Sequence, residues 1–190
     1  MKIMCGIAGF LSKSYRKSYD KNFLKISKDL SHRGPDSSNY YKYKNNLFIH
    51  TRLSIIDLEG GIQPIVNNDL VLVANGEIYN DSEIRAKFKK YNFKTRSDSE
   101  SIMALYHKEG ITGLKNLRGM YAFAIYDRKK NITILSRDIF GIKPLYFCQL
   151  EDSFIFCSEI QPMLNLNLIN KNISKKKLLE YFELQYCSGK

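Results

Sequence analysis

The stretch MKIMCGIAGF (residues 1–10) places a cysteine at position 5, directly before a short apolar segment that contains two glycines. The apolar residues, with glycines that let neighbouring backbones approach closely, predict a buried strand. Cys5 then has two interpretations. Either it is a small inert thiol of the core, which is the usual role of a buried cysteine, or it is a nucleophile that acts from the amino terminus once Met1–Met4 are absent or removed.

From residue 20 onward the predicted elements come in groups instead of alternating one strand with one helix. A helix comes first, then two strands, a β-rich segment with an Asn-Gly tight-turn signal, two helices, a series of hairpins, and a last helix capped by Ser174. The first helix is expected at 20–30, the two strands at 40–43 and 47–56, and the β-rich segment at 69–81. The two helices are expected at 82–91 and 97–107, the hairpins at 120–160, and the last helix at 172–185. Grouped elements favour antiparallel sheets covered by helices, so the sequence predicts a layered α+β fold.

Composition indicates one globular domain and disfavours several classes of protein. The chain has 190 residues, 44% of them hydrophobic and 13% aromatic, which is enough for a sizeable core. The formal net charge is +11, but the lysines are scattered among acidic residues, so we predict no nucleic-acid partner. The four cysteines show neither CxxC spacing nor a histidine cluster, which disfavours disulfides and a metal site. No apolar run reaches the about 18 residues of a membrane span, so we expect no membrane and a cytoplasmic protein.

Two polar clusters stand out because apolar packing does not require them. In HTRLSIID, Arg52 follows His50 in a strand-like segment. It needs an anion, which is either a substrate carboxylate or a salt-bridge partner at a strand edge. In ANGEIYN, Asn75 and Gly76 either form a hairpin turn or supply two N–H donors to a developing oxyanion. Glu77 beside them is then free to meet an ammonium group.

The third cluster is RSDSES, in which Ser97 or Asp98 either caps the following helix or, for Asp98, offers a carboxylate to a substrate amine. Together the three clusters supply an anion receptor, an oxyanion pocket and a cation receptor. A nucleophilic cysteine that attacks the side-chain amide of an amino acid needs all three.

Seven motifs then occur in one order across most of the chain: MCGIAGF, HRGPDSS, HTRLSIIDLEGGIQPI, LVANGEIYN, RSDSESI, LRGMYAFAIYD and SRDIFGIKPLYF. In this order they resemble the N-terminal glutaminase domain of glutamine-hydrolysing asparagine synthetases, class II amidotransferases of the N-terminal-nucleophile hydrolase group. The resemblance implies a four-layer αββα sandwich of two antiparallel sheets flanked by helices.

The resemblance also implies the chemistry. Cys5 matches the catalytic cysteine, whose thiolate attacks the glutamine amide carbon while its own α-amino group accepts the thiol proton. Asn75 and Gly76 match the oxyanion hole. No metal and no cofactor are implied for this half-reaction.

The remaining matched positions would bind the substrate. Arg52 would hold the α-carboxylate of L-glutamine, and Glu77 and Asp98 would receive its α-ammonium. The residues that shape the pocket around them, with Asn75 and Gly76, are Leu53, Ser54, Ile55 and Ile56.

The family's second domain is not found in these residues, because no SGGxDS-type pyrophosphate loop occurs among them. We expect a glutaminase domain at 5–166 and a linker helix at 167–190 that leads towards an ATP-dependent synthetase domain, in cis or in trans. ATP and Mg²⁺ would serve only that domain, which amidates aspartate. Other acceptors of the same branch (a sugar acid or a peptide), a silent glutamine-binding domain and a homodimer stay open. The family chemistry also requires Cys5 to be the first residue, by translation from Met4 or by processing.

Overall fold

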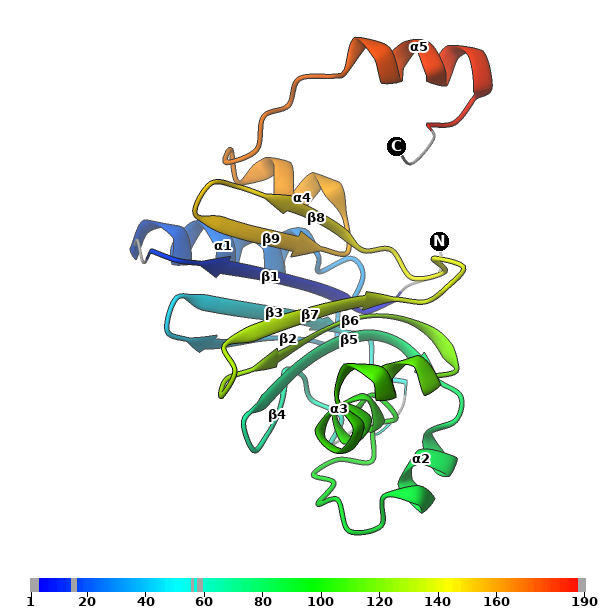
Figure 1. Ribbon diagram of the computed structural model, residues 1–190. Coiled ribbons are helices and arrows are strands. Elements are labelled where there is room, and N and C mark those ends of the chain that lie inside the picture. The colour runs from blue at the N-terminus through cyan, green and yellow to red at the C-terminus, as the bar shows by residue number, and fades with distance from the viewer. Residues whose placement is uncertain (1–3, 15–16, 56, 58–59, 188–190) are drawn as a thin grey trace.

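A computed structural model describes residues 4–14, 17–55, 57 and 60–187, and in residues 17–22 it describes only the main chain. Two antiparallel sheets lie face to face, and helices cover the outer face of each, so that the layers follow the order helix, sheet, sheet, helix (Figure 1). The α+β prediction and the four-layer arrangement are confirmed.

The first sheet has the strand order β2-β3-β1-β9-β8, and every neighbouring pair is antiparallel. Its strands are β1 (Gly6–Ser12), β2 (Ser37–Tyr43), β3 (Asn46–Arg52), β8 (Tyr146–Gln149) and β9 (Ser153–Cys157). The strand predicted after Cys5 is therefore β1, and it is paired on both sides. Gly9 is required here, because a Cβ at this position would lie 2.0 Å from the Phe156 ring.

The second sheet has the order β4-β5-β6-β7 and is also antiparallel. Its strands are β4 (Ile65–Asn67), β5 (Leu70–Ile78), β6 (Gly119–Asp127) and β7 (Ile132–Arg137). The apolar run of β5 is explained by burial of both its faces. Val71 and Val73 face the first sheet, whereas Leu72 and Ala74 pack under the helices.

Each of the two sheets is covered by its own helices. Helices α1 (Lys17–Asp29) and α4 (Ile160–Asn165) lie on the first sheet, and α2 (Asp81–Lys87) and α3 (Glu100–Gly113), with the short 3-10 turn η1 (Leu114–Asn116), lie on the second (Figure 1). Buried clusters accordingly form under each helical layer and between the sheets. Phe48, Tyr126 and Phe156 are the large aromatic residues of the cluster between the sheets.

Two local predictions are wrong. The Asn-Gly pair is not a turn, because Asn75 and Gly76 lie inside β5, opposite Ala122 and Tyr121 of β6. Nine consecutive strand pairs outweigh the local turn preference of this dipeptide. The helix predicted at 97–107 begins later, with Ser99 at the N-cap position and no side-chain cap bond.

The last helix, α5 (Lys175–Leu184), is confirmed together with its cap, since the Ser174 side chain accepts a hydrogen bond from the Lys177 N–H. None of its residues is buried. It lies apart from the sheets at the carboxyl end of the described residues (Figure 1).

Candidate active site

One cavity of about 510 Å³ opens between the two sheets at the end where β1 begins and β3 ends. Eight of the predicted site residues line it: Cys5, Arg52, Leu53, Ile55, Asn75, Gly76, Glu77 and Asp98. They come from four separate segments of the chain, which the sandwich brings together. Ser54 is not among the lining residues, and Ile56 lies outside the described residues.

Cys5 immediately precedes β1, and its thiol lies against the end of β3. The Leu53 N–H donates to Sγ at 3.3 Å, and Sγ lies 3.5 Å from the Leu53 carbonyl oxygen. Burial raises the pKa of the Cys5 thiol above its ordinary value of 9.0, although the Leu53 N–H and the charges of Arg52 and Arg33 oppose this shift. The thiol is therefore protonated at neutral pH, and a base must remove its proton before it can attack.

The position of Cys5 is fixed from a second side by Arg33, which sequence reasoning did not assign to the site. Arg33 is 8% exposed, and its Nε donates to the Cys5 carbonyl oxygen at 3.1 Å. Its Nη1 pairs with Glu159 at 3.0 Å, and His32 contacts the same carboxylate at 2.9 Å. The signal was available, because both His32 and Arg33 belong to HRGPDSS.

Arg52 ends β3 and is almost buried, at 6% exposure. Its Nη2 donates to the Asp57 carbonyl oxygen at 2.5 Å, which fixes the guanidinium at the cavity wall. A fixed and nearly buried guanidinium offers planar N–H donors to a carboxylate.

Asn75 and Gly76 lie on β5 across the cavity from β3. Asn75 is 2% exposed, and within the described part of the chain its Nδ2 has no hydrogen-bond partner. A buried amide donor without a partner is costly unless a ligand or water accepts its hydrogen bond. Gly76 has φ of +155°, and a Cβ there would lie 2.1 Å from the Met120 carbonyl oxygen, so only glycine fits.

Two carboxylates line the same cavity. Asp98 is 8% exposed and accepts a hydrogen bond from the Ile78 N–H at 2.6 Å, so it ties the segment before α3 to β5 instead of capping the helix. Burial raises the pKa of Asp98, backbone N–H groups oppose this, and the neighbouring charges of Asp81 and Glu77 raise it further. These adjacent negative charges favour a bound cation, which would restore the ionised form.

His50 is a further lining residue that was noticed in the sequence but not assigned. It precedes Arg52 by two residues, so both side chains lie on the same face of β3. Burial lowers the pKa of His50 to about 3, although the nearby main chain of Ala74 opposes this shift. His50 is thus neutral and does not serve as an acid near neutral pH.

The remaining lining residues were also missed by sequence reasoning. They are Met4, Gly61, Gln63, Ala74, Ser97, Ser99, Met120, Ile142 and Lys143. Gln63 is held by the main chain of Ala74, with which it exchanges two hydrogen bonds. Lys143 donates to the Met4 sulfur at 3.3 Å.

Glu100 supports the Asp98 segment from behind. Its side chain is 0% exposed, and its carboxylate accepts hydrogen bonds from the Thr95 N–H at 2.7 Å, the Lys94 N–H at 2.8 Å and Asn67 Nδ2 at 3.0 Å. All of these donors point at one carboxylate, so the loop that leads to Asp98 depends on it.

Replacing Glu100 with glutamine should therefore lower the free energy of unfolding by about 1–3 kcal/mol, because an NH₂ group would face N–H donors in a buried site. Urea unfolding followed by circular dichroism measures the change. Glu83→Gln is the control, since Glu83 is exposed and pairs with exposed Arg118, and we expect a change within about 0.5 kcal/mol. Equal stability of Glu100→Gln and the unmodified protein would contradict this role.

Two further searches of the described residues concern metal-binding side chains and long apolar helices. Residues 4–14, 17–55, 57 and 60–187 contain no group of three or more histidine, cysteine, aspartate or glutamate side chains placed to hold a metal. No helix within these ranges is long and apolar enough to cross a bilayer.

Comparison with known proteins identifies relatives by both sequence and fold. Asparagine synthetase [glutamine-hydrolyzing] 2 of Bacillus subtilis is 42% identical over 165 residues, which are 84% of this chain and 22% of the relative. Asparagine synthetase B of Escherichia coli is 44% identical over 147 residues, which are 75% of this chain and 26% of the relative. The chain thus spans about a quarter of the length of these curated relatives.

The fold is also found in a solved structure. The glutamine phosphoribosylpyrophosphate amidotransferase of B. subtilis matches with a TM-score of 0.67 and 21% identity, over 86% of this chain and 44% of that chain. At this identity the likeness concerns the fold alone. Residues 4–190 match the glutamine amidotransferase domain family. The chain belongs to this family of enzymes, as the glutamine amidotransferase domain of asparagine synthetase homologues.

Proposed function

We propose that this chain hydrolyses L-glutamine to glutamate and ammonia, with Cys5 as the nucleophile, and that the ammonia serves a synthetase domain. The observation that carries the proposal is one cavity that holds a thiol, a nearly buried guanidinium, two carboxylates and an amide donor that has no hydrogen-bond partner among the described residues. Each group can bind or react with one part of glutamine or of the transition state for its hydrolysis.

In the proposed complex the substrate lies between the two sheets. Arg52 holds the α-carboxylate, and Glu77 and Asp98 receive the α-ammonium. These contacts at the α-carbon leave the side-chain amide to reach the Cys5 thiol. Leu53 and Ile55 shape the wall of the pocket, which places the amide carbon for attack.

The proposed reaction has two halves. The α-amino group of Cys5 takes the thiol proton, Sγ bonds to the amide carbon, and the oxyanion that forms is stabilised by Asn75 Nδ2 and the Gly76 N–H. The amine then gives the proton to the leaving nitrogen, so ammonia departs and a thioester remains. Water attacks the thioester, which releases glutamate and restores the thiol. Nucleophile and base both come from the chain, so this half-reaction needs no cofactor.

The proposed reaction requires a free α-amino group on Cys5. While Met4 precedes Cys5, the Cys5 nitrogen is part of an amide and has no basic lone pair. An α-amino group has a pKa of about 8, which suits a base near neutral pH. We therefore propose that the active form begins at Cys5.

The acceptor of the ammonia is proposed from the relatives, whose names describe glutamine-hydrolysing asparagine synthetases. We infer that a synthetase domain, in cis or in trans, uses ATP and Mg²⁺ to amidate aspartate, and that ammonia passes to it through a channel. Residues 5–166 would form the glutaminase domain, and 167–190, with α5, none of whose residues is buried, would form the connection to the synthetase. A reducing compartment such as the cytoplasm suits the reactive thiol.

The test is intact mass measurement with and without a glutamine analogue that carries a diazoketone. We expect the form that begins at Cys5 to gain the mass of the analogue less N₂, with the modification at Cys5, whereas the form that retains Met1–Met4 stays unlabelled. Excess L-glutamine should protect Cys5. Absence of labelling in a folded protein that begins at Cys5 would reject the enzyme and leave a silent glutamine-binding domain.

A further inference from the structure

The loop between β7 and β8 spans residues 138–145, and its part 138–143 is fixed to the second sheet by a buried carboxylate. Asp138 is 5% exposed and accepts hydrogen bonds from the N–H groups of Ile142 at 2.8 Å, Lys143 at 3.0 Å and Tyr121 at 3.2 Å. Two of these donors belong to the loop and one to β6. The loop is therefore closed on itself and attached to the sheet by the same side chain.

Arg137 fixes the loop from a second direction. Its guanidinium donates to the Gly141 carbonyl oxygen at 2.5 Å and to the Lys143 carbonyl oxygen at 2.6 Å. With both the N–H groups and the carbonyl groups of the loop engaged, its main chain has little freedom to turn its side chains inward.

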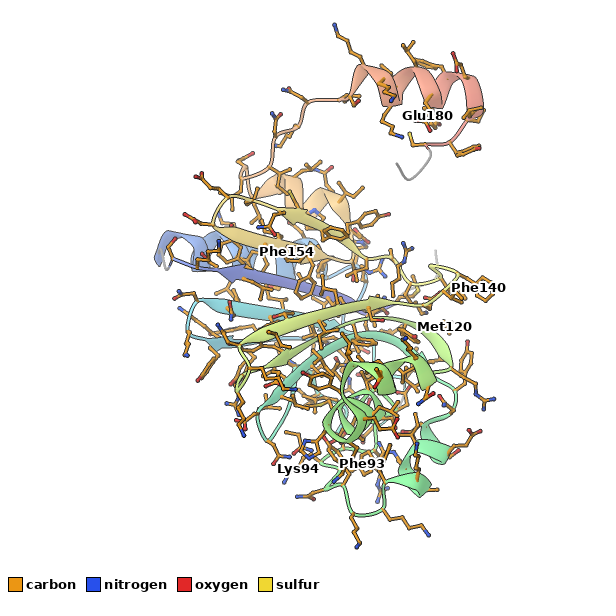
Figure 2. The ribbon with its side chains drawn as sticks, viewed as in Figure 1. Phe93, Lys94, Met120, Phe140, Phe154 and Glu180 are labelled. Atoms are coloured by element: carbon orange, nitrogen blue, oxygen red, sulfur yellow. The ribbon has the colours of Figure 1, made fainter. Side chains whose placement is uncertain are left out.

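This fixed loop nevertheless holds two adjacent apolar side chains in solvent. Ile139 is 92% exposed and Phe140 is 85% exposed. Figure 2 shows Phe140 at the tip of the loop, pointing away from the sheets. A single exposed apolar residue is ordinary, but two neighbours held outward by a dedicated hydrogen-bond set are typical of an interaction surface.

The surface is continuous with the rim of the candidate active site. Ile142 and Lys143, the next residues of the loop after Gly141, line the cavity that contains Cys5, and so does Met120. Figure 2 places Met120 and Phe140 at the same end of the sandwich. A protein that covers Ile139 and Phe140 would thus lie next to the cavity from which ammonia leaves.

We propose that Ile139 and Phe140 form a docking surface for the ammonia-consuming synthetase domain, an inference that rests on the proposed function. The segment that matches this chain is 22% of one curated relative and 26% of the other. Each relative therefore carries a larger part beside the matched domain. Ammonia released into water becomes protonated and loses its nucleophilicity. An apolar contact beside the cavity excludes water where the acceptor must receive ammonia.

The experiment joins this chain, from Cys5 to Lys190, to the part of the B. subtilis relative that follows its matched segment. The first measurement is hydroxyl-radical footprinting of Ile139 and Phe140 in the joined protein and in the free chain. Docking should lower their oxidation at least about fivefold in the joined protein, because buried hot-spot side chains are shielded from solvent. This readout does not depend on glutaminase activity.

The second measurement is the ratio of asparagine to glutamate formed from glutamine. The double change Ile139→Ser and Phe140→Ser should lower this ratio at least about fivefold. Glutamine hydrolysis by the free chain and asparagine formation from added ammonium should both stay unchanged, because neither residue lines the cavity. Ile111→Ser is the matched control, since Ile111 is 62% exposed on α3, and it should leave the ratio unchanged.

The outcomes separate the two proposals. A free chain that begins at Cys5 and does not hydrolyse glutamine would reject the proposed function, while the footprint would still decide the docking surface. An unchanged footprint in the joined protein, or an unchanged ratio in the double variant of an active protein, would reject the docking surface. Protection of Phe140 in the free chain together with a dimeric mass would assign the surface to a second copy and would also reject it.

Discussion

Replacing Cys5 with serine should lower glutamine hydrolysis by about a thousandfold or more, the scale seen when an enzyme loses its nucleophile. Serine has nearly the volume of cysteine, so the fold should be kept. Its hydroxyl, however, is far less acidic and does not become a comparable nucleophile beside an amine. The measurement is glutamate release by both proteins in the form that begins at residue 5, and stability is followed by thermal unfolding.

Cys148 provides the control for this experiment. It lies half-buried on β8 and does not line the cavity, so Cys148→Ser should retain full activity. If Cys5→Ser kept more than about a tenth of the activity, covalent catalysis by this thiol would be ruled out.

The pH dependence of the active form should follow the α-amine and not the thiol. Because burial raises the pKa of the Cys5 thiol, the base that takes its proton must be unprotonated for reaction to begin. Hydrolysis at low substrate should therefore fall as the pH drops below the amine pKa of about 8 and level off above it.

Replacing Asn75 with alanine should lower kcat for glutamine by about a hundredfold to a thousandfold with little change in KM, because the lost donor acts on the oxyanion and not on the ground-state substrate. Steady-state kinetics of the form that begins at Cys5 provides both constants. A change confined to KM would instead indicate that Asn75 only binds the substrate.

Stability distinguishes this role from a structural one. Within the described residues Asn75 Nδ2 has no partner, so its removal should cost the fold little. Asn67 is the contrast, since its Nδ2 lies within hydrogen-bond distance of Tyr91 Oη, the Asn92 carbonyl oxygen and the Glu100 carboxylate. Asn67→Ala should destabilise the protein by about 1–3 kcal/mol. Equal losses of stability in the two variants would contradict the proposed function of Asn75.

Local patterns predicted those parts of the fold whose structure is determined locally. The hairpins from Met120 onward and the Ser174 cap depend on near neighbours in the chain, and both are confirmed. The strand after Cys5 is also confirmed, although its partners β3 and β9 are distant in the sequence, because its apolar run by itself indicates a buried strand. The Asn-Gly turn was wrong, because pairing with β6 determines the conformation of Asn75. Of the two alternatives for RSDSES, the cap by Ser97 or Asp98 is not found, because Ser99 holds the N-cap position and the Asp98 carboxylate accepts a hydrogen bond from a main-chain N–H of β5.

The candidate site could be predicted in part for the same reason. Its polar residues stand out where packing does not require them, as Arg52 and Asn75 do. The residues that hold these side chains in place, however, cannot be recognised in the sequence. Arg33 contacts a residue 28 positions away, and Glu100 is an ordinary helix residue until the loop at Lys94 and Thr95 closes over it. Such contacts depend on how loops and chain segments close on one another, which periodicity does not specify.

The double pairing of β1 determines how the protein should be prepared for study. Cys5 directly precedes β1, which pairs with β3 on one side and with β9 on the other. The position of the Cys5 main chain within the domain is therefore fixed. An affinity tag at the amino end would acylate the very nitrogen on which the proposed chemistry depends. A tag that follows α5, none of whose residues is buried, would leave that nitrogen free. An inactive preparation with an amino-terminal tag would therefore say nothing about the enzyme.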